Sequence, residues 1–372
     1  MKKSLLAVAL LGTFAASAFA APSVTLYGRI DTGLLYTHAD ADTAADAVDN
    51  VQMSTGFSTG SRWGLKGTED LGNVKVGFVL ENGFNSDDGV DAQPGRMFGR
   101  EALVSVSGAY GTLYAGRMST LNSDGGSIGM LGVASPFGSC WGVASMKLST
   151  GSSFDRYDNT LAYVSPTFAG FKGEAMYSFK ADSTKQGTAN ENKADVTRYA
   201  AAGVQYQAGA FTGVLAGDYT MWDNRADGLK GIDDGYSIFL GGNYDFGVAT
   251  VYGQATYFDN AANYSKETVK DLGLSFGNDT KAVKGWGAAL STKVPAFGGD
   301  ILATVGYRDA KDVQNTNVKY ERWNAGVGYT YAFSKRTNVY GFAGYAQEKS
   351  KGGRDARTPN VTQAGFGLVH KF

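Results

Sequence analysis

The chain has 372 residues, of which 43% are hydrophobic, 13% aromatic and 19% charged, and its formal net charge is -1. Balanced charge with many aromatic residues excludes a disordered tail and a basic protein whose affinity comes from neutralising phosphates. The single cysteine, Cys140, excludes an intramolecular disulfide framework. Glycine is abundant, with 52 residues, and there are 21 tyrosines and 21 phenylalanines, which favours packed strands over helices.

The N-terminal segment has the features of a secretory signal. Two lysines precede an apolar run from Leu5 to Phe19, and residues 18–20 have the small-x-small form of a signal-peptidase site. A membrane anchor helix is the alternative, but Gly12 interrupts the run, which is shorter than the roughly 20 apolar residues that a span needs. The sequence therefore predicts a signal peptide over residues 1–20 and a mature domain over residues 21–372.

Alternation of apolar and polar residues with a period of two recurs along the mature chain. Between residues 24 and 36 an apolar row alternates with a polar row that includes Arg29 and Asp31. Such alternation indicates β-strands with one apolar face and one wet face. The same pattern recurs at residues 74–81, 236–246, 301–307 and 323–333.

Short turns and long polar loops alternate between the predicted strands. The short turns are predicted at residues 68–73, 107–111, 166–170, 207–210, 246–248, 295–299 and 334–337. The long loops are predicted at residues 38–53, 85–96, 119–155, 180–196, 221–234, 259–282, 310–318 and 346–359. Together these connections imply about 16 antiparallel strands, with short connections at one end and long ones at the other.

This pattern is typical of an outer-membrane barrel. Lipid offers the backbone no hydrogen-bond partners, so a sheet that crosses a membrane has to close on itself. A soluble β-sandwich also has alternating strands, but its polar face meets bulk water. Aromatic residues at strand ends favour the barrel, because they match the interfacial girdles of such proteins. We therefore predict an all-β fold, a transmembrane antiparallel β-barrel of about 16 strands.

The C-terminal strand supports this prediction. Ala364, Phe366, Leu368, His370 and the terminal Phe372 form one row, which we expect to face outward. An alternating last strand that ends in phenylalanine is similar to the recognition signal that outer-membrane barrels present to their assembly machinery. Phe372 is accordingly the predicted assembly signal.

Several segments resemble the general trimeric porins of Gram-negative outer membranes, in particular the β-proteobacterial branch. The matching segments are residues 24–31 (VTLYGRID), 60–72 (GSRWGLKGTEDLG), 98–100 (FGR), 116–117 (GR), 156–166 (RYDNTLAYVSP), 170–171 (GF) and 367–372 (GLVHKF). The resemblance implies a 16-stranded barrel, a homotrimer in the outer membrane of a Gram-negative bacterium, and contact with lipid, lipopolysaccharide and the barrel assembly machinery.

The resemblance also implies that the third loop, residues 119–155, folds inward and narrows the channel. Its apolar segment from Ile128 to Val133 would be unusual on a free surface loop. The loop departs from the family pattern in carrying Cys140 and Trp141 and in offering few acids, chiefly Asp124 and Asp155.

Charged residues that face the lumen are the candidate site, because a pore acts through its radius and its field. Arg29 and Arg62 lie on wet faces, and the family pattern implies that Arg100, Arg117 and Arg156 also point inward. These five arginines would form a basic wall opposite Asp124 and Asp155 of the loop, with a charge that desolvation does not remove. The alternative is that some of them pair with nearby acids, namely Glu81, Glu101 or Asp31, and brace the barrel.

Catalytic and metal-binding patterns are weak in this sequence. His38 lies in a predicted loop and His370 on the outer row, so neither is placed for a serine triad. No Cys/His spacing suits a zinc site, and glycine-rich segments lack the lysine of a phosphate loop. Asp87, Asp88 and Asp91 could bind a divalent ion or lipopolysaccharide, but solvated loops commonly carry such clusters.

The sequence therefore predicts a non-enzymatic porin without metal, cofactor or nucleic-acid partner. Its expected function is passive diffusion of ions and small hydrophilic solutes, with a weak preference for anions. Two alternatives remain open at this stage. One is a substrate-selective anion channel, and the other is an outer-membrane barrel enzyme such as a phospholipase or a protease.

Overall fold

The computed structural model describes residues 23–44, 47–149, 156–186, 188–223, 229–262, 280–353 and 356–372, and the backbone of 267–269 and 274–275. The predicted signal segment, residues 1–20, lies outside these ranges. Among the residues described, no helix is long and apolar enough to cross a membrane.

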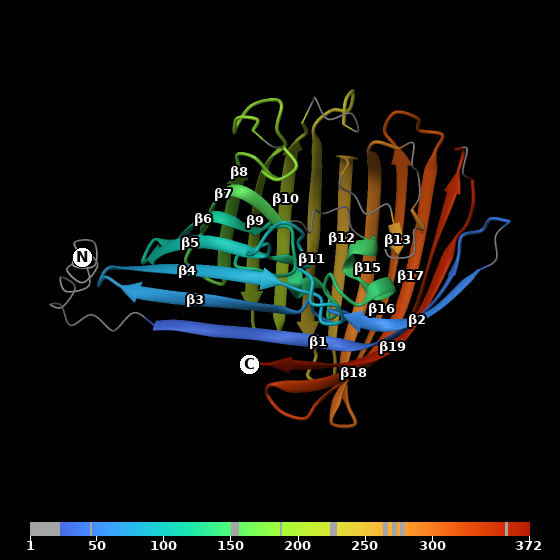
Figure 1. The fold of residues 1–372 in the computed structure, drawn as a ribbon, viewed down its shortest axis with the longest axis horizontal. Helices are drawn as coiled ribbons and strands as arrows, with labels where there is room; N and C mark the ends of the chain where they lie inside the picture. Colours follow the sequence, from blue (N-terminus) through green and yellow to red (C-terminus); the bar gives the residue numbers. More distant parts are fainter. Residues whose placement is uncertain are drawn as a thin grey trace, which may run out of the picture.

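One antiparallel sheet makes up nearly all of the regular structure (Figure 1). Its strands are β1 (Ser23–Asp40), β2 (Val48–Thr55), β3 (Arg62–Asp70), β4 (Val74–Gly83), β5 (Glu101–Gly108), β6 (Gly111–Ser119), β7 (Arg156–Val164), β8 (Phe171–Ser178), β9 (Arg198–Ala208), β10 (Phe211–Met221), β11 (Gly235–Asp245), β12 (Thr250–Ala261), β15 (Val283–Ala296), β16 (Gly299–Asp312), β17 (Lys319–Ala332), β18 (Thr337–Lys351) and β19 (Asn360–Lys371). A separate pair is formed by β13 (Glu267–Val269) and β14 (Leu274–Ser275).

The sheet closes into a barrel because its first and last strands pair. β1 pairs with β19 from Arg29 opposite Lys371 to Asp40 opposite Asn360. β2 and β3 both pair with β1, along separate stretches, so together they occupy one position in the wall. The barrel therefore has 16 strand positions, which confirms the predicted fold.

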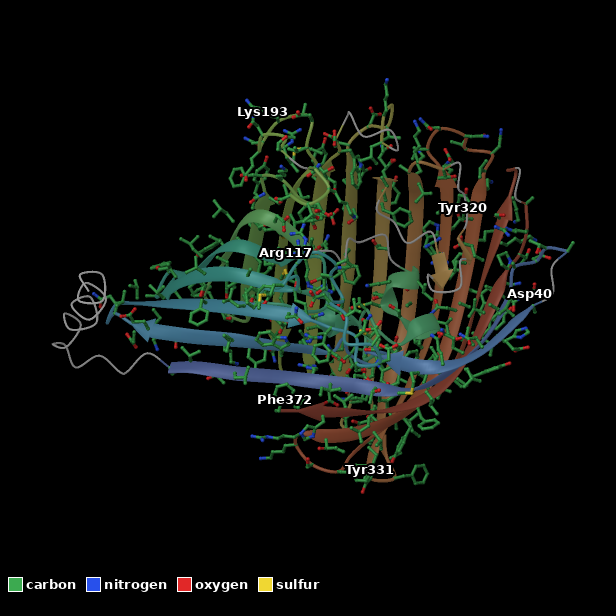
Figure 2. All side chains as sticks on the ribbon, in the orientation of Figure 1. Asp40, Arg117, Lys193, Tyr320, Tyr331 and Phe372 are labelled. Carbon is green, nitrogen blue, oxygen red and sulfur yellow. The ribbon has the colours of Figure 1, made fainter. Side chains whose placement is uncertain are left out.

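The two ends of the barrel differ as the sequence predicts, with one correction. All seven predicted short turns connect neighbouring strands at one end. Figure 2 shows Tyr331 at this end and Lys193 in a long connection at the other. The predicted first loop, residues 38–53, is wrong in extent. β1 runs to Asp40 and β2 begins at Val48, because residues 48–53 pair back onto β1.

The strands expose one row of side chains and bury the other. On β1, Val24 and Leu26 are 62% and 60% exposed, whereas the side chain of Asp31 on the inner row is fully buried. The predicted outward row of β19 shows the same phase, with Phe366 exposed and the intervening Gln363 buried. The outer surface is therefore apolar and the inner face carries the polar side chains.

Residues 119–149 lie against the inner face of the barrel. They contain three short helical turns, η1 (Leu131–Ala134), η2 (Gly142–Ala144) and η3 (Met146–Ser149). In Figure 1 these turns, in green, lie within the ring of strands. η1 contacts β10 to β12, η3 contacts β15 to β17, and η2 contacts β17 to β19. These turns thus cover the side of the lumen opposite β3 to β7.

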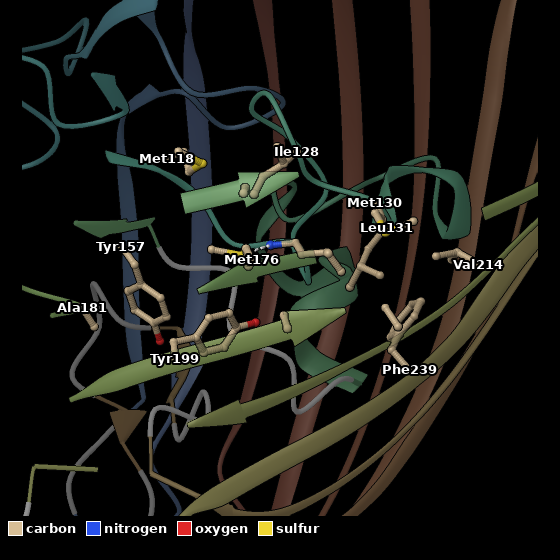
Figure 3. Close-up of a cluster of buried hydrophobic side chains, with 14 of the residues drawn as sticks. Met118, Ile128, Met130, Leu131, Tyr157, Met176, Ala181, Tyr199, Val214 and Phe239 are labelled. Carbon is tan, nitrogen blue, oxygen red and sulfur yellow. Dashed lines mark hydrogen bonds between the residues drawn. The ribbon is translucent and has the colours of Figure 1, made fainter. Parts of the chain in front are cut away.

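Two apolar clusters hold this segment to the wall. In the first, Met130 and Leu131 pack with Val214 and Phe239 of β10 and β11 (Figure 3). In the second, Trp141, Val143 and Leu148 pack with side chains of β1, β16, β18 and β19. Burial of these large side chains explains why so apolar a sequence connects two strands of the barrel.

Candidate functional site

The predicted arginines lie in one belt across neighbouring strands. Strand register places Arg29 opposite Arg62, Glu81 opposite Glu101, Ala102 opposite Arg117, and Ser119 opposite Arg156. Arg100 lies directly before β5, so it and the adjacent Glu101 are both buried on the inner side. The structure therefore brings all five predicted arginines together, along β1 and β3 to β7; Figure 2 labels Arg117 in this region. We call these five, with Arg96, the basic wall.

Two arginines of the basic wall share Glu81. The Nε atom of Arg100 donates to Oε1 of Glu81 at 2.6 Å, and Nη1 of Arg62 lies 3.8 Å from the same oxygen. The Tyr27 hydroxyl also donates to this carboxylate, at 3.0 Å. Glu81 thus partly neutralises two guanidinium groups and fixes their positions.

Two further arginines share Asp158, which the sequence did not single out. Nη1 of Arg117 lies 2.6 Å from Oδ1 of Asp158, and Nη2 of Arg96 lies 2.9 Å from Oδ2. Arg96 also contacts Asp182 in the connection after β8, at 2.7 Å. Asp158 stands two residues after Arg156 in the family-like segment, which is the signal that could have identified it.

Arg29 and Arg156 have no carboxylate partner within the described parts of the chain. Nη1 of Arg29 donates to the hydroxyl of Thr59 at 3.1 Å. Nε of Arg156 is buried without a hydrogen-bond partner, while its main-chain oxygen accepts from Arg117. Among the described residues no ion pair offsets the charge of these two groups, although Glu81 and Glu101 lie near enough to Arg156 to act on it.

The charge balance of the basic wall is slightly positive. Its six arginines face five carboxylates, those of Asp31, Glu81, Glu101, Asp158 and Asp182. Of these acids, Glu101 is bonded to residues 119–149, which we call the inner segment, through the amide and hydroxyl of Ser127, at 2.6 and 2.9 Å. The site is therefore a belt of paired charges with a small cationic excess.

Polar side chains from other strands fix the path of the inner segment. They come from β5, β10, β11, β12, β17 and β19, and each bonds to a backbone or side-chain group of residues 122–149. These bonds are Glu101 to Ser127, Asp218 to Asn122, Asn243 to Val133, Gln254 to Met146 and Ser149, and both Asn324 and Gln363 to Val143. The segment is thus attached around much of the barrel wall, which limits its motion.

Asp124, one of the two acids predicted on the third loop, makes no ion pair with the basic wall among the described residues. Its Oδ2 accepts from the amide of Ser139 at 2.6 Å. Asp155 lies outside the described residues. The charge of Asp124 instead acts on the thiol of Cys140, within the same segment.

A second group of arginines lies on the far wall and was not predicted. Arg308 on β16 and Arg322 on β17 both contact Oε2 of Glu348 on β18, the first at 2.6 Å. All three side chains are 1% exposed or less. The alternation of β16 and β17 places residues 308 and 322 on the inner row, so the pattern contained the signal.

Outside the barrel wall, Asp182 shows how the loops attach to the basic wall. Burial raises the pKa of this carboxyl, but the hydrogen bonds from Thr184 and the Lys185 amide, together with the Arg96 charge, outweigh burial. The pKa of Asp182 therefore lies below its usual value.

Within the described ranges, no three His, Cys, Asp or Glu side chains gather as a metal site would require.

Comparison with known proteins agrees with this architecture. The model of the Gram-negative porin family matches residues 7–352. The chain belongs to the Gram-negative porin family. An outer membrane porin protein of Bordetella pertussis is 34% identical over 400 aligned residues that cover both chains completely. Outer membrane porin protein 32 of Delftia acidovorans is 31% identical, over 94% of this chain and 90% of the relative.

A solved structure supports the same assignment. The structure described as an anion-selective porin from Comamonas acidovorans matches with a TM-score of 0.64 and 26% identity, over 94% of this chain and 100% of that one. This porin is therefore an outer-membrane channel of a Gram-negative bacterium, as the sequence predicts. The comparisons point to a channel rather than to an enzyme.

Proposed function

We propose that this porin is a passive diffusion channel with a weak preference for anions, narrowed between the basic wall and the inner segment. The observation that carries this proposal is the incomplete pairing of the wall. Glu81 and Asp158 are each shared by two arginines, while Arg29 and Arg156 have no carboxylate partner among the described residues. The anion selectivity named for the Comamonas porin is consistent with it.

The Coulomb energy between an ion and the unpaired arginines determines how strong the anion preference can be. An ion about 8 Å from one guanidinium feels about 0.5 kcal/mol at a dielectric constant of 80. Arg29 and Arg156 together then contribute about 1 kcal/mol, of opposite sign for an anion and a cation. Screening over one Debye length leaves about a three- to fivefold change in the anion-to-cation permeability ratio. Salt screens the field over about 8 Å at physiological ionic strength, so the preference weakens as salt rises.

The test is the reversal potential of the purified channel in a planar bilayer with a potassium chloride gradient. We expect a reversal potential of anion-preferring sign that decreases as total salt increases. The double variant Arg29→Gln with Arg156→Gln should lower the permeability ratio by up to about fivefold. Lys349→Gln, outside the basic wall, is the matched charge control. A double variant with the parental reversal potential would show that these arginines do not set selectivity.

We also propose that residues 1–20 are a cleaved signal peptide and that the mature chain is a homotrimer in lipid and lipopolysaccharide. The apolar outer rows of β1, β2 and β19 support a contact between copies near the chain ends, because Val24, Val51 and Phe366 are more than 60% exposed. The expected result is an oligomer in mild detergent that becomes a monomer on boiling. Only monomers in native mass measurements would contradict it.

Assembly is proposed to depend on Phe372. Its backbone exchanges two hydrogen bonds of 3.1 Å with Gly28 of β1, so the last residue takes part in closing the barrel. Gly28 is required by this closure, because a Cβ there would lie 2.4 Å from the Phe372 ring. Deletion of Phe372 should reduce the level of folded oligomer in the outer membrane, and an unchanged level would exclude a role for it in assembly.

A further inference from the structure

The wall of the barrel is interrupted between β2 and β3. Thr55 lies opposite Thr32 of β1, and Arg62 lies opposite Arg29, so six residues, 56–61, face only two residues of β1. We call this segment the inward bulge. Its phenylalanine, Phe57, is buried among side chains inside the barrel. An insertion of this size leaves the sheet and projects towards the lumen.

A buried carboxylate fixes the inward bulge. Oδ2 of Asp31 accepts hydrogen bonds from the amide and hydroxyl of Ser58 and from the amide of Thr59, at 2.8, 2.9 and 2.8 Å. Its Oδ1 accepts from the Tyr340 hydroxyl at 2.7 Å. Asp31 is fully buried, and a buried carboxylate needs such donors to offset its lost hydration. The conformation of the inward bulge is thus specified by Asp31.

One side of the inward bulge contacts the inner segment. The carbonyl of Phe57 accepts from the amide of Trp141 at 2.7 Å. The Phe57 ring lies 6.0 Å from the Trp141 ring and 5.2 Å from the Phe342 ring of the wall. Gly142 is needed beside it, because its φ is +49° and a Cβ there would lie 3.1 Å from Phe57.

The backbone of Trp141 indicates that these contacts hold this residue in an unfavourable conformation. Its φ of 68° and ψ of 32° lie in the left-handed region, which is unfavourable for a residue with a bulky side chain. Such a conformation persists only where surrounding contacts over-determine it. The rings of Phe57, Phe137, Tyr340 and Phe342 surround Trp141 and supply those contacts.

The other side of the inward bulge contacts the basic wall. The Thr59 hydroxyl accepts from Nη1 of Arg29 at 3.1 Å and from Nη2 of Arg62 at 3.4 Å. The carbonyl of Gly60 accepts from Nε of Arg62 at 2.9 Å. A single six-residue segment therefore touches both the arginines and the inner segment that faces them.

We propose that the inward bulge is the spacer of the channel: it sets the distance between the basic wall and the inner segment, with Asp31 as its anchor and Phe57 as its contact with Trp141. Phe57, Thr59 and Asp31 are positioning residues, because they act through the arginines and the inner segment. The proposal rests on the proposed function, since that function places the narrowest part of the channel between these two surfaces.

Cys140 provides a probe for this proposal without engineering. It is the only cysteine of the chain, it precedes Trp141, and its thiol interacts with the backbone of Gly60 in the inward bulge. Cys140 is partly buried, and burial raises the pKa of its thiol, so it reacts more slowly than a free thiol while the contact is intact. The measurement is the rate at which a charged methanethiosulfonate labels the folded oligomer, followed by intact mass.

We expect Phe57→Ala to raise the labelling rate of Cys140 about tenfold, because three ring contacts that oppose local opening are lost. Asp31→Asn should raise it as well, since it weakens the anchor without touching the inner segment. The matched control is Phe258→Ala, which removes a fully buried ring from β12, away from the inward bulge, and should change the rate less than about twofold.

The outcomes separate this proposal from the proposed function. Parental labelling rates in folded Phe57→Ala and Asp31→Asn would overturn it, as would equal acceleration in Phe258→Ala, which would indicate general loosening. Phe57→Leu and Ser58→Ala are milder variants that carry the same test if the others do not assemble. Reversal potentials report the proposed anion preference, whereas labelling of Cys140 reports the spacer, so either can fail alone.

Discussion

Two groups of arginines line the inside of this barrel, and they differ in exposure. In the basic wall the side chains of Arg62, Arg96 and Arg117 keep 14 to 16% of their surface exposed. On the far wall Arg308 and Arg322 are 1% exposed or less, although they too share one carboxylate. Pairing of arginines with a shared carboxylate therefore has two results. At the basic wall it leaves an electrostatic field in the lumen, and on the far wall it forms a buried structural cluster, which we call the enclosed brace.

Burial decides between these roles. A partly solvated guanidinium acts on passing ions through water, while a fully buried one is costly to desolvate and acts mainly on its neighbours. The belt along β1 and β3 to β7 thus has the properties of a selectivity element. The cluster of Arg308, Arg322 and Glu348 joins three adjacent strands and has the properties of a structural element.

The largest effect is expected at the enclosed brace. Glu348→Gln leaves two buried arginines without their shared charge partner and should lower the free energy of unfolding by about 3–5 kcal/mol. Unfolding of the oligomer in urea, followed by tryptophan fluorescence, measures it. The control is Glu321→Gln, which removes the exposed Lys351 pair on the same strands and should cost less than about 1 kcal/mol. An equal loss of unfolding free energy in Glu348→Gln and Glu321→Gln would contradict a structural role for the buried cluster.

A smaller effect is expected in the basic wall, on selectivity. Glu81→Gln removes the carboxylate shared by Arg62 and Arg100. The interaction energy of an anion about 8 Å away then becomes more favourable by about 0.5 kcal/mol. The anion-to-cation permeability ratio should rise about twofold at physiological salt and more at low salt, measured as a shift of the reversal potential. Glu348→Gln should leave that potential unchanged if the channel folds. A shift of equal size there would mean that the far wall also faces the ion path.

The smallest effect is expected where a loop joins the basic wall. The pKa of Asp182 is lowered on folding, so its contribution to stability is present above its unfolded pKa and is lost as pH falls through the folded value. Asp182→Asn should therefore destabilise the porin by about 0.3 kcal/mol at neutral pH, with the discount that a partly exposed pair requires. The difference from the parent should shrink as the pH falls below the usual range of an aspartate, measured by thermal unfolding at neutral and at acidic pH. A pH-independent difference would exclude this ionisation as its cause.

Much of the architecture is determined by local pattern. The period-two alternation identifies the strands and assigns Arg29 and Asp31 to the inner face, because neighbouring side chains in a strand point to opposite sides. Short turn sequences locate all seven tight connections, and the C-terminal row around Phe366 has the expected outward phase. These features follow from a few adjacent residues, so local pattern was sufficient to predict the barrel. Three arginines of the basic wall were instead predicted from the family resemblance, namely Arg100, Arg117 and Arg156.

Other features depended on residues far apart in the chain. Pairing of both β2 and β3 with β1 turns residues 56–61 into the inward bulge, and no local pattern shows that Asp31 will meet Tyr340. The shared partners Glu81 and Asp158, like Glu348 on the far wall, are selected by register across strands rather than by spacing. Closure of the sheet into a barrel determines these contacts, because it brings side chains of separate strands into the same interior space.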